Sequence, residues 1–344
     1  MAISISELSD EVGELKALLD SAREVLIIGH KDADGDTLGC SLAFAEALET
    51  QGKQAYVLIP PPLPDLYCWL PGFDRVVEAP PAGVDPALVL FFDAGNMERS
   101  GGMASYVGDH ATVVNIDHHA SNSRFGDLNL IDAESLTQEP ASAVGQMCLD
   151  LLEHFGWPVT ASIATNLYTA LMTDTGGFRH ENTTPRALAD AARLARYGAD
   201  PGYIAAMVYK SRPLTTLRLQ SLSLAAMQVE MEGRLAWAKV SKKMLRETGA
   251  VMAESEGIID TLNSIAGLQV AVVFKEIGAQ LTKISVRTRG KVDAAAICAH
   301  YGGGGHLRAA GAEVALAMED AIATVRATAT EAIAEHAPRG SKRK

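Results

Sequence analysis

Aspartate and histidine side chains follow directly after apolar runs at several places in the sequence. The set consists of His30, Asp34 and Asp36 in GHKDADGDTLG, Asp93 after VLFF, and Asp117, His118 and His119 after VVNI. Asp174, in LMTDTGGFRH, ends a run with helical periodicity. Carboxylates gathered at a buried site repel one another and lose hydration unless a cation compensates their charge. If the fold brings these residues together, we expect them to hold divalent metal.

The types of candidate ligand narrow the choice of metal and its chemistry. The four cysteines are widely spaced and form no CxxC pair, so neither a zinc knuckle nor a disulfide framework is indicated. Aspartate and histidine ligands without thiolate favour Mn²⁺ or Mg²⁺. Two such ions about 3.5–4 Å apart can clamp a phosphoryl group and activate water at neutral pH. The pattern therefore indicates a metal site suited to phosphoryl chemistry.

Each motif taken alone also has a structural explanation. A single histidine at a strand end is often a hydrogen-bonded structural residue, and the DADGD segment around Asp34 could be a turn. The DTG at Asp174 is found in aspartic proteases, but it occurs once here and follows a helical pattern rather than a strand. The interpretation therefore depends on the whole set of residues.

The elements that must position these residues alternate between strands and helices. Near-continuous apolar runs predict strands at 24–30, 54–60, 87–94 and 112–119, and helical spacing predicts helices at 37–52, 142–155 and 161–173. This alternation is typical of a doubly wound α/β domain with a mainly parallel sheet. Ligands of such sheets bind at the carboxyl ends of the strands, which is where the candidate residues stand.

A second, smaller α+β region follows. A helical stretch over 186–230 leads to predicted strands at 234–241, 270–276 and 281–289 and predicted helices at 292–301 and 318–336. We expect four parts: a metal-binding domain over 1–190, a helical linker over 191–225, a second domain over 226–336, and a basic disordered tail over 337–344.

Composition excludes several classes of function. The 344 residues carry a formal net charge of −12, which argues against a surface for long duplex nucleic acid, because such binding depends on neutralising phosphates. The start of the chain lacks the basic and apolar parts of a signal peptide, and no apolar run approaches about 18 residues. We expect a cytoplasmic protein that does not bind a membrane. A homodimer is left open.

The motifs together resemble a known family. GHKDADGDTLGC resembles the GHxxPDGDxxGS motif of the DHH phosphoesterases, DHH and DTGGF complete that set, and YGGGGHLRAAG resembles the GGGH signature of the DHHA1 domain. At this length the chain is similar to the nanoRNase and pAp phosphatase group. Two positions depart from the pattern: Ala33 replaces a proline, and Cys40 replaces a serine. Neither is a metal-ligand position.

The resemblance implies a role for each matched residue. His30, Asp34 and Asp93 would hold one Mn²⁺, while Asp36, Asp93, His118 and Asp174 would hold the other, with Asp93 bridging and Mg²⁺ as an alternative metal. Asp117 would orient a ligand imidazole. His119 would face the substrate and give a proton to the leaving oxygen.

The second domain would bind the substrate across an active-site cleft. The resemblance places Gly303, Gly304, Gly305 and His306 at the non-scissile phosphate or terminal nucleotide. Successive glycines let backbone N–H groups turn towards an anion. Arg287 could make a two-pronged phosphate contact, and Arg99 is a further candidate.

The function implied is a Mn²⁺-dependent hydrolase of dinucleotides and very short oligoribonucleotides, with pAp as a second substrate. Related activities remain as alternatives: a cyclic dinucleotide (c-di-AMP) phosphodiesterase, a RecJ-type single-strand exonuclease, and a family II inorganic pyrophosphatase. From another class, a non-catalytic module that binds nucleotides or RNA ends would share the GGGH element. The complete ligand set argues against such a module.

Overall fold

The computed structural model describes residues 9–133 and 140–336, so the predicted tail 337–344 lies outside the described residues. The chain forms two compact units, residues 1–211 and 212–344. The division falls inside the segment 191–225 that the sequence predicts as a linker. Unit 1 carries the metal-ligand candidates, and unit 2 carries the glycine-rich loop.

Unit 1 is built on a six-stranded sheet in the order β3-β2-β1-β4-β5-β6, in which every pair of neighbours is parallel. Its strands are β1 (Glu24–Ile28), β2 (Gln54–Leu58), β3 (Val76–Val77), β4 (Leu88–Phe92), β5 (Thr112–Asp117) and β6 (Leu128–Ile131). The four longest predicted strands are present, and the parallel α/β architecture is confirmed. The short edge strands β3 and β6 were not predicted from the sequence.

The register of the sheet brings the candidate residues to one edge. Ile28 of β1 pairs with Phe91 of β4, and Phe92 pairs with Ile116 of β5. The residues that follow these pairs therefore leave the sheet at one level, at the carboxyl ends of three adjacent strands. The chain places β2 and β3 on one side of β1 and then β4, β5 and β6 on the other. Ligands of α/β sheets bind at the point where the strand order reverses in this way.

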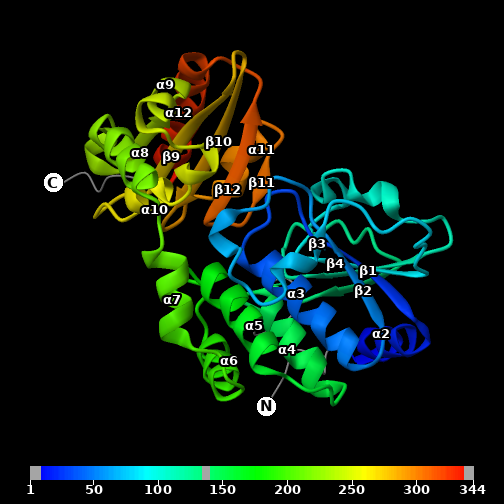
Figure 1. Cartoon of the computed structure of the whole chain (residues 1–344). Helices are drawn as coiled ribbons and strands as arrows, with labels where there is room; N and C mark the ends of the chain where they lie inside the picture. The colour runs from blue at the N-terminus through cyan, green and yellow to red at the C-terminus, as the bar shows by residue number, and fades with distance from the viewer. Residues whose placement is uncertain (1–8, 134–139, 337–344) are drawn as a thin grey trace. The chain divides into compact units, whose positions relative to one another are not determined.

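The two faces of this sheet are covered differently. One face packs against α2 (Ser9–Ser21), α3 (Gly35–Thr50), α4 (Val144–His154) and α5 (Ala161–Asp174), which share its largest apolar core (Figure 1). The other face packs against the segment between β4 and β5, which forms only the short 3₁₀ turns η3 (Met97–Ser100) and η4 (Met103–Tyr106). That segment carries several glycines, which disfavour a longer helix.

Two glycines allow α3 to lie directly against α5. A Cβ on Gly35 would collide with the side chain of Thr173, and a Cβ on Gly39 would collide with the carbonyl of Asn166. The absence of side chains at these two positions brings the first turn of α3 beside the last turn of α5. This approach matters for the site because Asp36 and Asp174 lie in those turns.

Three helices follow α5: α6 (Pro185–Arg196), α7 (Pro201–Lys210) and α8 (Leu214–Ala225). The last ends before the predicted limit of 230, because residues 228–230 form the edge strand β7 (Gln228–Glu230) of unit 2. None of the helices among the described residues has the length and apolar character needed to cross a membrane.

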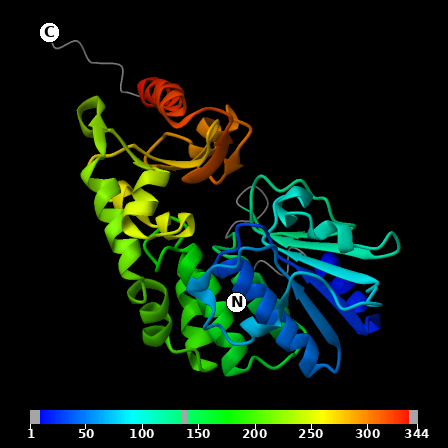
Figure 2. The same cartoon turned by 45° about the horizontal axis from the view of Figure 1, so that its top comes forward.

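Unit 2 contains a mixed six-stranded sheet in the order β11-β12-β10-β9-β8-β7, in which β8 and β9 are parallel and the other pairs antiparallel (Figure 2). Its strands are β8 (Leu235–Val240), β9 (Val270–Gly278), β10 (Leu281–Thr288), β11 (Gly304–Gly305) and β12 (Ala309–Val314), besides β7. Helices α11 (Ala294–Ala299) and α12 (Met318–Glu335) pack on one face. Helices α8, α9 (Lys242–Thr248) and α10 (Ile258–Asn263) pack on the other.

Candidate metal centre

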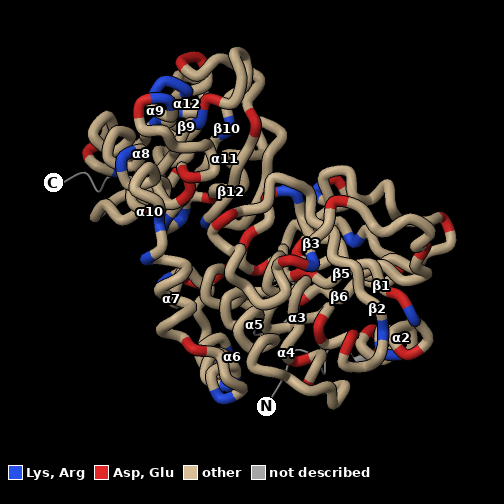
Figure 3. Tube along the Cα trace, in the orientation of Figure 1, with Lys and Arg blue, Asp and Glu red and all other residues tan. Residues whose placement is uncertain are grey.

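Six of the predicted ligands form two groups at the carboxyl edge of the unit 1 sheet, and each group offers ligand atoms that all lie within 4.8 Å of one another. We call them the His30 cluster (His30, Asp34 and Asp93) and the His118 cluster (Asp36, His118 and Asp174). In Figure 3 acidic segments of unit 1 lie close together between α3 and the ends of the strands.

The His30 cluster is formed by the residues that follow β1 and β4. Nε2 of the buried His30 ring lies 3.2 Å from Asp93 Oδ2 and 4.0 Å from Asp34 Oδ1. Its Nδ1 accepts the backbone N–H of Asp32 at 3.2 Å. In this arrangement Nε2 therefore carries the ring proton and donates it to Asp93.

Asp34 has a second task at the start of α3. It is the N-cap residue of this helix, and its Oδ1 accepts the backbone N–H groups of Asp36 and Thr37, each at 3.0 Å. An aspartate in this position satisfies amides that the helix cannot pair itself. The other carboxylate oxygen of Asp34 makes no contact of this kind, and 51 % of the side chain is exposed.

The His118 cluster joins the ends of α3, β5 and α5. His118 Nε2 lies 3.9 Å from Asp36 Oδ2, 3.8 Å from Asp93 Oδ1 and 3.7 Å from Asp174 Oδ2. One imidazole nitrogen thus faces three carboxylates at nearly equal distance. Asp36, Asp93 and His118 are buried, and Asp174 is partly exposed.

The segment 141–145 fixes two members of the His118 cluster. The Ala141 carbonyl lies 3.1 Å from Nδ1 of His118, and because a carbonyl only accepts, Nδ1 carries a proton and Nε2 is directed into the cluster. The N–H groups of Val144 and Gly145 donate to Asp36 Oδ2 and Oδ1 at 2.7 and 3.0 Å. Ligand imidazoles in metalloproteins are commonly oriented by such a contact at the other ring nitrogen.

Asp93 belongs to both clusters through different oxygens. Its Oδ2 faces His30 and accepts the hydroxyl of the buried Thr37 at 2.7 Å, while its Oδ1 lies 3.5 Å from Nδ1 of His119 and 3.8 Å from Nε2 of His118. Asp93 also adopts a left-handed backbone conformation (φ 57°), which is uncommon outside glycine. The two oxygens of Asp93 therefore face the two clusters, as a carboxylate shared by two ions could.

Asp117 and His119 form a separate pair beside the two clusters. His119 Nδ1 lies 2.7 Å from Asp117 Oδ1, and the amide of Asn122 donates to Asp117 Oδ2 at 2.5 Å. The sequence interpretation placed Asp117 behind a ligand imidazole. The structure pairs Asp117 with His119, which could itself be a ligand together with Asp93, while His118 is oriented by a backbone carbonyl.

The charges of the site are unbalanced without a cation. Burial, followed by the neighbouring carboxylates, raises the pKa of Asp36 well above its usual range, and burial raises the pKa of Asp174 to about 7. Burial alone would lower the pKa of His118, but Asp174, Asp36 and Asp93 raise it to about 10. Burial likewise opposes ionisation of Asp93, yet the adjacent His30, His119 and His118 hold its pKa below its usual range. In the absence of metal, protons therefore supply the positive charge.

The donor set fits divalent metal. The two clusters offer oxygen and imidazole nitrogen atoms without thiolate, and the nearest cysteine, Cys40, directs its Sγ to Asp36 Oδ1 at 3.2 Å. Hard oxygen donors with imidazole suit Mn²⁺ and Mg²⁺. The side chains present are therefore consistent with two divalent ions that share Asp93.

The predicted substrate-binding residues lie in two places. Arg99 lies in η3 of unit 1, where its carbonyl accepts the N–H of Lys31 and its Nε is buried without a hydrogen-bond partner among the described residues. In unit 2, Arg287 on β10 pairs in register with Ala309, immediately after the loop that ends in His306, and its Nε lies 3.5 Å from Asp260 Oδ1.

The glycine-rich loop of unit 2 requires its glycines. A Cβ on Gly303 would collide with the Gly311 carbonyl, and Gly305 has a φ of 143° and a Cβ position against the backbone of Ala309. The loop is closed by His306, whose N–H donates to the Ala309 carbonyl at 2.8 Å. These glycines are needed because the segment pairs closely with β12, and the N–H of Gly303 donates to the Cys298 carbonyl at 3.0 Å.

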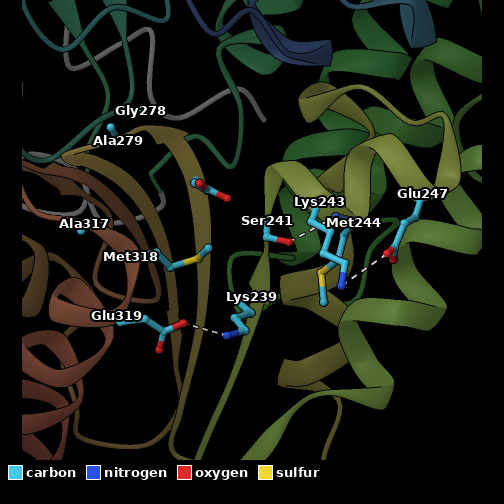
Figure 4. Close-up of a pocket in the computed structure, with 11 residues that line it drawn as sticks. Lys239, Ser241, Lys243, Met244, Glu247, Gly278, Ala279, Ala317, Met318 and Glu319 are labelled. Carbon is cyan, nitrogen blue, oxygen red and sulfur yellow. Dashed lines mark hydrogen bonds and ion pairs between the residues drawn. The ribbon is translucent and has the colours of Figure 1, made fainter.

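A pocket of about 560 Å³ lies at the opposite end of β10, beside the β9–β10 turn (Figure 4). Lys239 Nζ lies 2.8 Å from Glu319, and Lys243 Nζ lies 3.7 Å from Glu247. The residues that line this pocket include none of the predicted site residues.

Sequence reasoning missed the residues that support the ligands. Thr37 and Asn122 donate to Asp93 and Asp117, and both stand within a few residues of a predicted ligand, so a search for hydroxyl and amide groups near the motifs would have found them. The Ala141 carbonyl is a backbone group, so no residue type in the sequence indicates its role. Only the fold reveals it.

Comparison with known proteins agrees with this architecture. Residues 24–177 match the DHH family, N-terminal domain, and residues 233–335 match the DHHA1 domain. The chain belongs to the DHH/DHHA1 phosphoesterase family. It is 34 % identical to the bifunctional oligoribonuclease and PAP phosphatase NrnA of Thermus thermophilus, over 84 % of this chain and 83 % of that protein.

Two further matches bear on fold and function. The chain is 26 % identical to the cyclic-di-AMP phosphodiesterase GdpP of Geobacillus thermodenitrificans, over 87 % of this chain but only 46 % of that protein. A crystal structure of an exopolyphosphatase-related protein from Bacteroides fragilis has the same fold, with a TM-score of 0.82, 24 % identity, and coverage of 95 % of this chain and 96 % of the other.

Proposed function

We propose that the protein is a Mn²⁺-dependent phosphohydrolase that cleaves dinucleotides and very short oligoribonucleotides to mononucleotides and dephosphorylates pAp to AMP. The observation that carries this proposal is the Asp93 carboxylate, whose two oxygens face the two ligand clusters. The similarity to the Thermus thermophilus oligoribonuclease and PAP phosphatase supports the choice of substrates. The widely spaced cysteines, which are free, support a cytoplasmic location.

Both proposed substrates undergo the same bond cleavage. In a 5′-phosphorylated dinucleotide and in pAp, the bond that breaks joins phosphorus to a nucleoside 3′-oxygen. The oxygen of water adds to phosphorus, the P–O bond breaks, and the departing 3′-oxygen takes a proton. Two divalent ions supply charge stabilisation for the phosphoryl oxygens and activation of the water.

The chain's own residues hold the ions and supply the proton. Asp93 spans the two clusters, and Asp36, His118 and Asp174 complete one of them. His119 is held at Nδ1 by Asp117 Oδ1, so Nε2 is the atom that transfers a proton to the leaving oxygen. Burial lowers the pKa of His119, but the Asp117 carboxylate raises it above its ordinary value overall, which is the direction that favours a general acid.

Unit 2 supplies the specificity in this proposal. Arg287 and the loop from Gly303 to His306 bind a phosphate or terminal nucleotide that is not cleaved. The position of Arg287, in register with Ala309 three residues after His306, supports this role. Anchoring of the far end would limit the substrate to a few nucleotides.

The test is a matched substrate panel with Mn²⁺: pApA, pAp, linear and cyclic di-AMP, pyrophosphate, and an RNA of about 24 nucleotides, with the Asp93→Asn variant as control. Release of AMP from pApA and pAp, absent in the variant, is the expected result. A preference for the long RNA would indicate a RecJ-type exonuclease, and cleavage of pyrophosphate alone would indicate a pyrophosphatase. Metal binding without any turnover would indicate a binding module.

A second candidate, hydrolysis of cyclic di-AMP, is favoured by the similarity to the Geobacillus thermodenitrificans phosphodiesterase. This chain spans less than half of that protein. Faster turnover of the cyclic than of the linear dinucleotide in the same panel would support it.

A further inference from the structure

The segment 141–145 connects the metal centre to a second, buried polar network in unit 1. The segment contacts His118 through the Ala141 carbonyl and Asp36 through two backbone amides, but none of its side chains enters either cluster. Its position therefore determines where two predicted ligands stand. Asn182 holds the segment on one side, through hydrogen bonds to the hydroxyl and the carbonyl of Ser142, and a second residue holds it from within α4.

Gln146, the third residue of α4, holds it from behind. Its Oε1 accepts the backbone N–H of Ser142 at 2.7 Å, and its Nε2 donates to Asp190 Oδ2 at 2.6 Å. Gln146 is 0 % exposed and Asp190 is 3 % exposed, so water cannot replace either bond readily. A primary amide suits this position because one end accepts an N–H and the other donates to a carboxylate.

Asp190 is in turn fixed on α6 by arginines. Arg193 Nη1 donates to its Oδ1 at 2.6 Å, and Arg186 Nε lies 3.8 Å from its Oδ2. Arg186 also pairs with the buried Asp150 at 2.7 Å and Asp132 at 3.2 Å, so its guanidinium has little freedom. Asp190 is therefore held in place as the hydrogen-bond acceptor for Gln146. It contacts no member of either metal cluster.

We propose that Gln146, oriented by Asp190, is a positioning residue for the metal centre, which fixes segment 141–145 at the position that His118 and Asp36 need to bind one of the ions. The proposal rests on the proposed two-metal function. It assigns to the α4–α6 contact a role in metal affinity as well as in packing. Changes in residues that support a metal ligand commonly weaken metal binding by about 10- to 100-fold.

The test measures Mn²⁺ affinity by the electron paramagnetic resonance signal of free Mn²⁺ for the full chain and for Gln146→Met, Gln146→Glu, Asp190→Asn and the double variant Gln146→Glu with Asp190→Asn. We expect about 10- to 100-fold weaker binding of one ion in each Gln146 single variant. The double variant restores a carboxylate–amide pair with reversed polarity, so its affinity should return to within a few-fold of the wild type. If Gln146→Met does not fold, Asp190→Asn tests the same bond from outside the segment.

Leu149→Ala is the matched control, because Leu149 is a fully buried core residue of the same helix that makes none of these hydrogen bonds. Its thermal unfolding temperature should fall while its Mn²⁺ affinity stays unchanged. Equal loss of affinity in this control, unchanged affinity in folded Gln146→Met, or no recovery in the double variant would each overturn the positioning role. Absence of Mn²⁺ binding by the wild type would instead overturn the proposed function.

Discussion

The two ligand clusters are prepared for metal to different degrees. In the His118 cluster, segment 141–145 orients both the histidine and Asp36, and Nε2 of the ring already faces the carboxylates. In the His30 cluster, by contrast, Asp34 is half exposed and its Oδ1 serves as a helix cap. A ligand held by its surroundings loses less conformational freedom on binding. We therefore expect the ion at the His118 cluster to bind more tightly than the ion at the His30 cluster.

The largest expected effect comes from the residue that the clusters share. Asp93→Asn removes a charge that faces both, so we expect loss of both high-affinity Mn²⁺ sites and of turnover. Asparagine tolerates the left-handed backbone of this position, so the fold should persist. Isothermal titration with Mn²⁺ measures the effect, with Asp109→Asn, an exposed aspartate, as the control. Retention of two ions by the variant would contradict the shared role.

Variants in which one histidine is replaced distinguish the metal affinities of the two clusters. His118→Ala should remove the tighter step of a Mn²⁺ titration, because it deletes the oriented ligand. His30→Ala should remove the weaker step and leave the tighter one. The stoichiometry and order of the steps, followed by electron paramagnetic resonance, give the comparison. The opposite assignment would show that orientation by the Ala141 carbonyl does not set affinity.

Metal binding should strengthen as pH rises. Without metal, His118 has a pKa of about 10 and Asp174 a pKa of about 7, the first from facing carboxylates against the effect of burial and the second from burial. The metal displaces these protons, so affinity should rise roughly tenfold per pH unit for each proton displaced below those values. Titration calorimetry in buffers of different ionisation enthalpy counts the protons released. A metal affinity that does not change between pH 6 and 9 would refute competition between the metal and protons.

The smallest predicted effect concerns Thr37, whose hydroxyl donates to Asp93 Oδ2. Thr37→Val keeps the shape and removes this donor, so we expect about 10- to 100-fold loss in metal affinity or activity. Thr37→Ser keeps the hydroxyl and should lose much less. Equal losses in the two variants would show that the effect does not depend on the hydroxyl hydrogen bond.

The residues that could be predicted from the sequence are those whose type carries the chemistry. Strands that end in histidine or aspartate are visible as apolar runs, and parallel pairing then brings their ends together. The supporting contacts of the His118 cluster could not be predicted in this way. They come from backbone atoms of Ala141, Val144 and Gly145, and nearly any residue type has the same backbone atoms. Only the packing of α3 against α4 directs these atoms towards the ligands.

The same limit applies to unit 2. Strand β12 reads AAGAEV and β11 is two glycines, so neither shows the run of branched side chains that indicates a strand. β12 is defined by its pairing with β10, and β11 by its pairing with β12. Helices α9 and α10 are too short for a periodic pattern. Long elements with a buried face were predicted, whereas β11, β12, α9 and α10 were not; the short helix α11, which lies within the predicted helix 292–301, is an exception.

The two amides that hold Asp36 are also the first two of helix α4, which begins after Ala143 without a side-chain cap of its own. The helix thus takes its cap from a residue 108 positions earlier in the chain. Its first turn cannot be completed until the β1–α3 segment has folded against it, because local sequence offers no substitute. Hydrogen exchange at Val144 and Gly145 will therefore report assembly of the metal centre in the complete absence of metal or substrate.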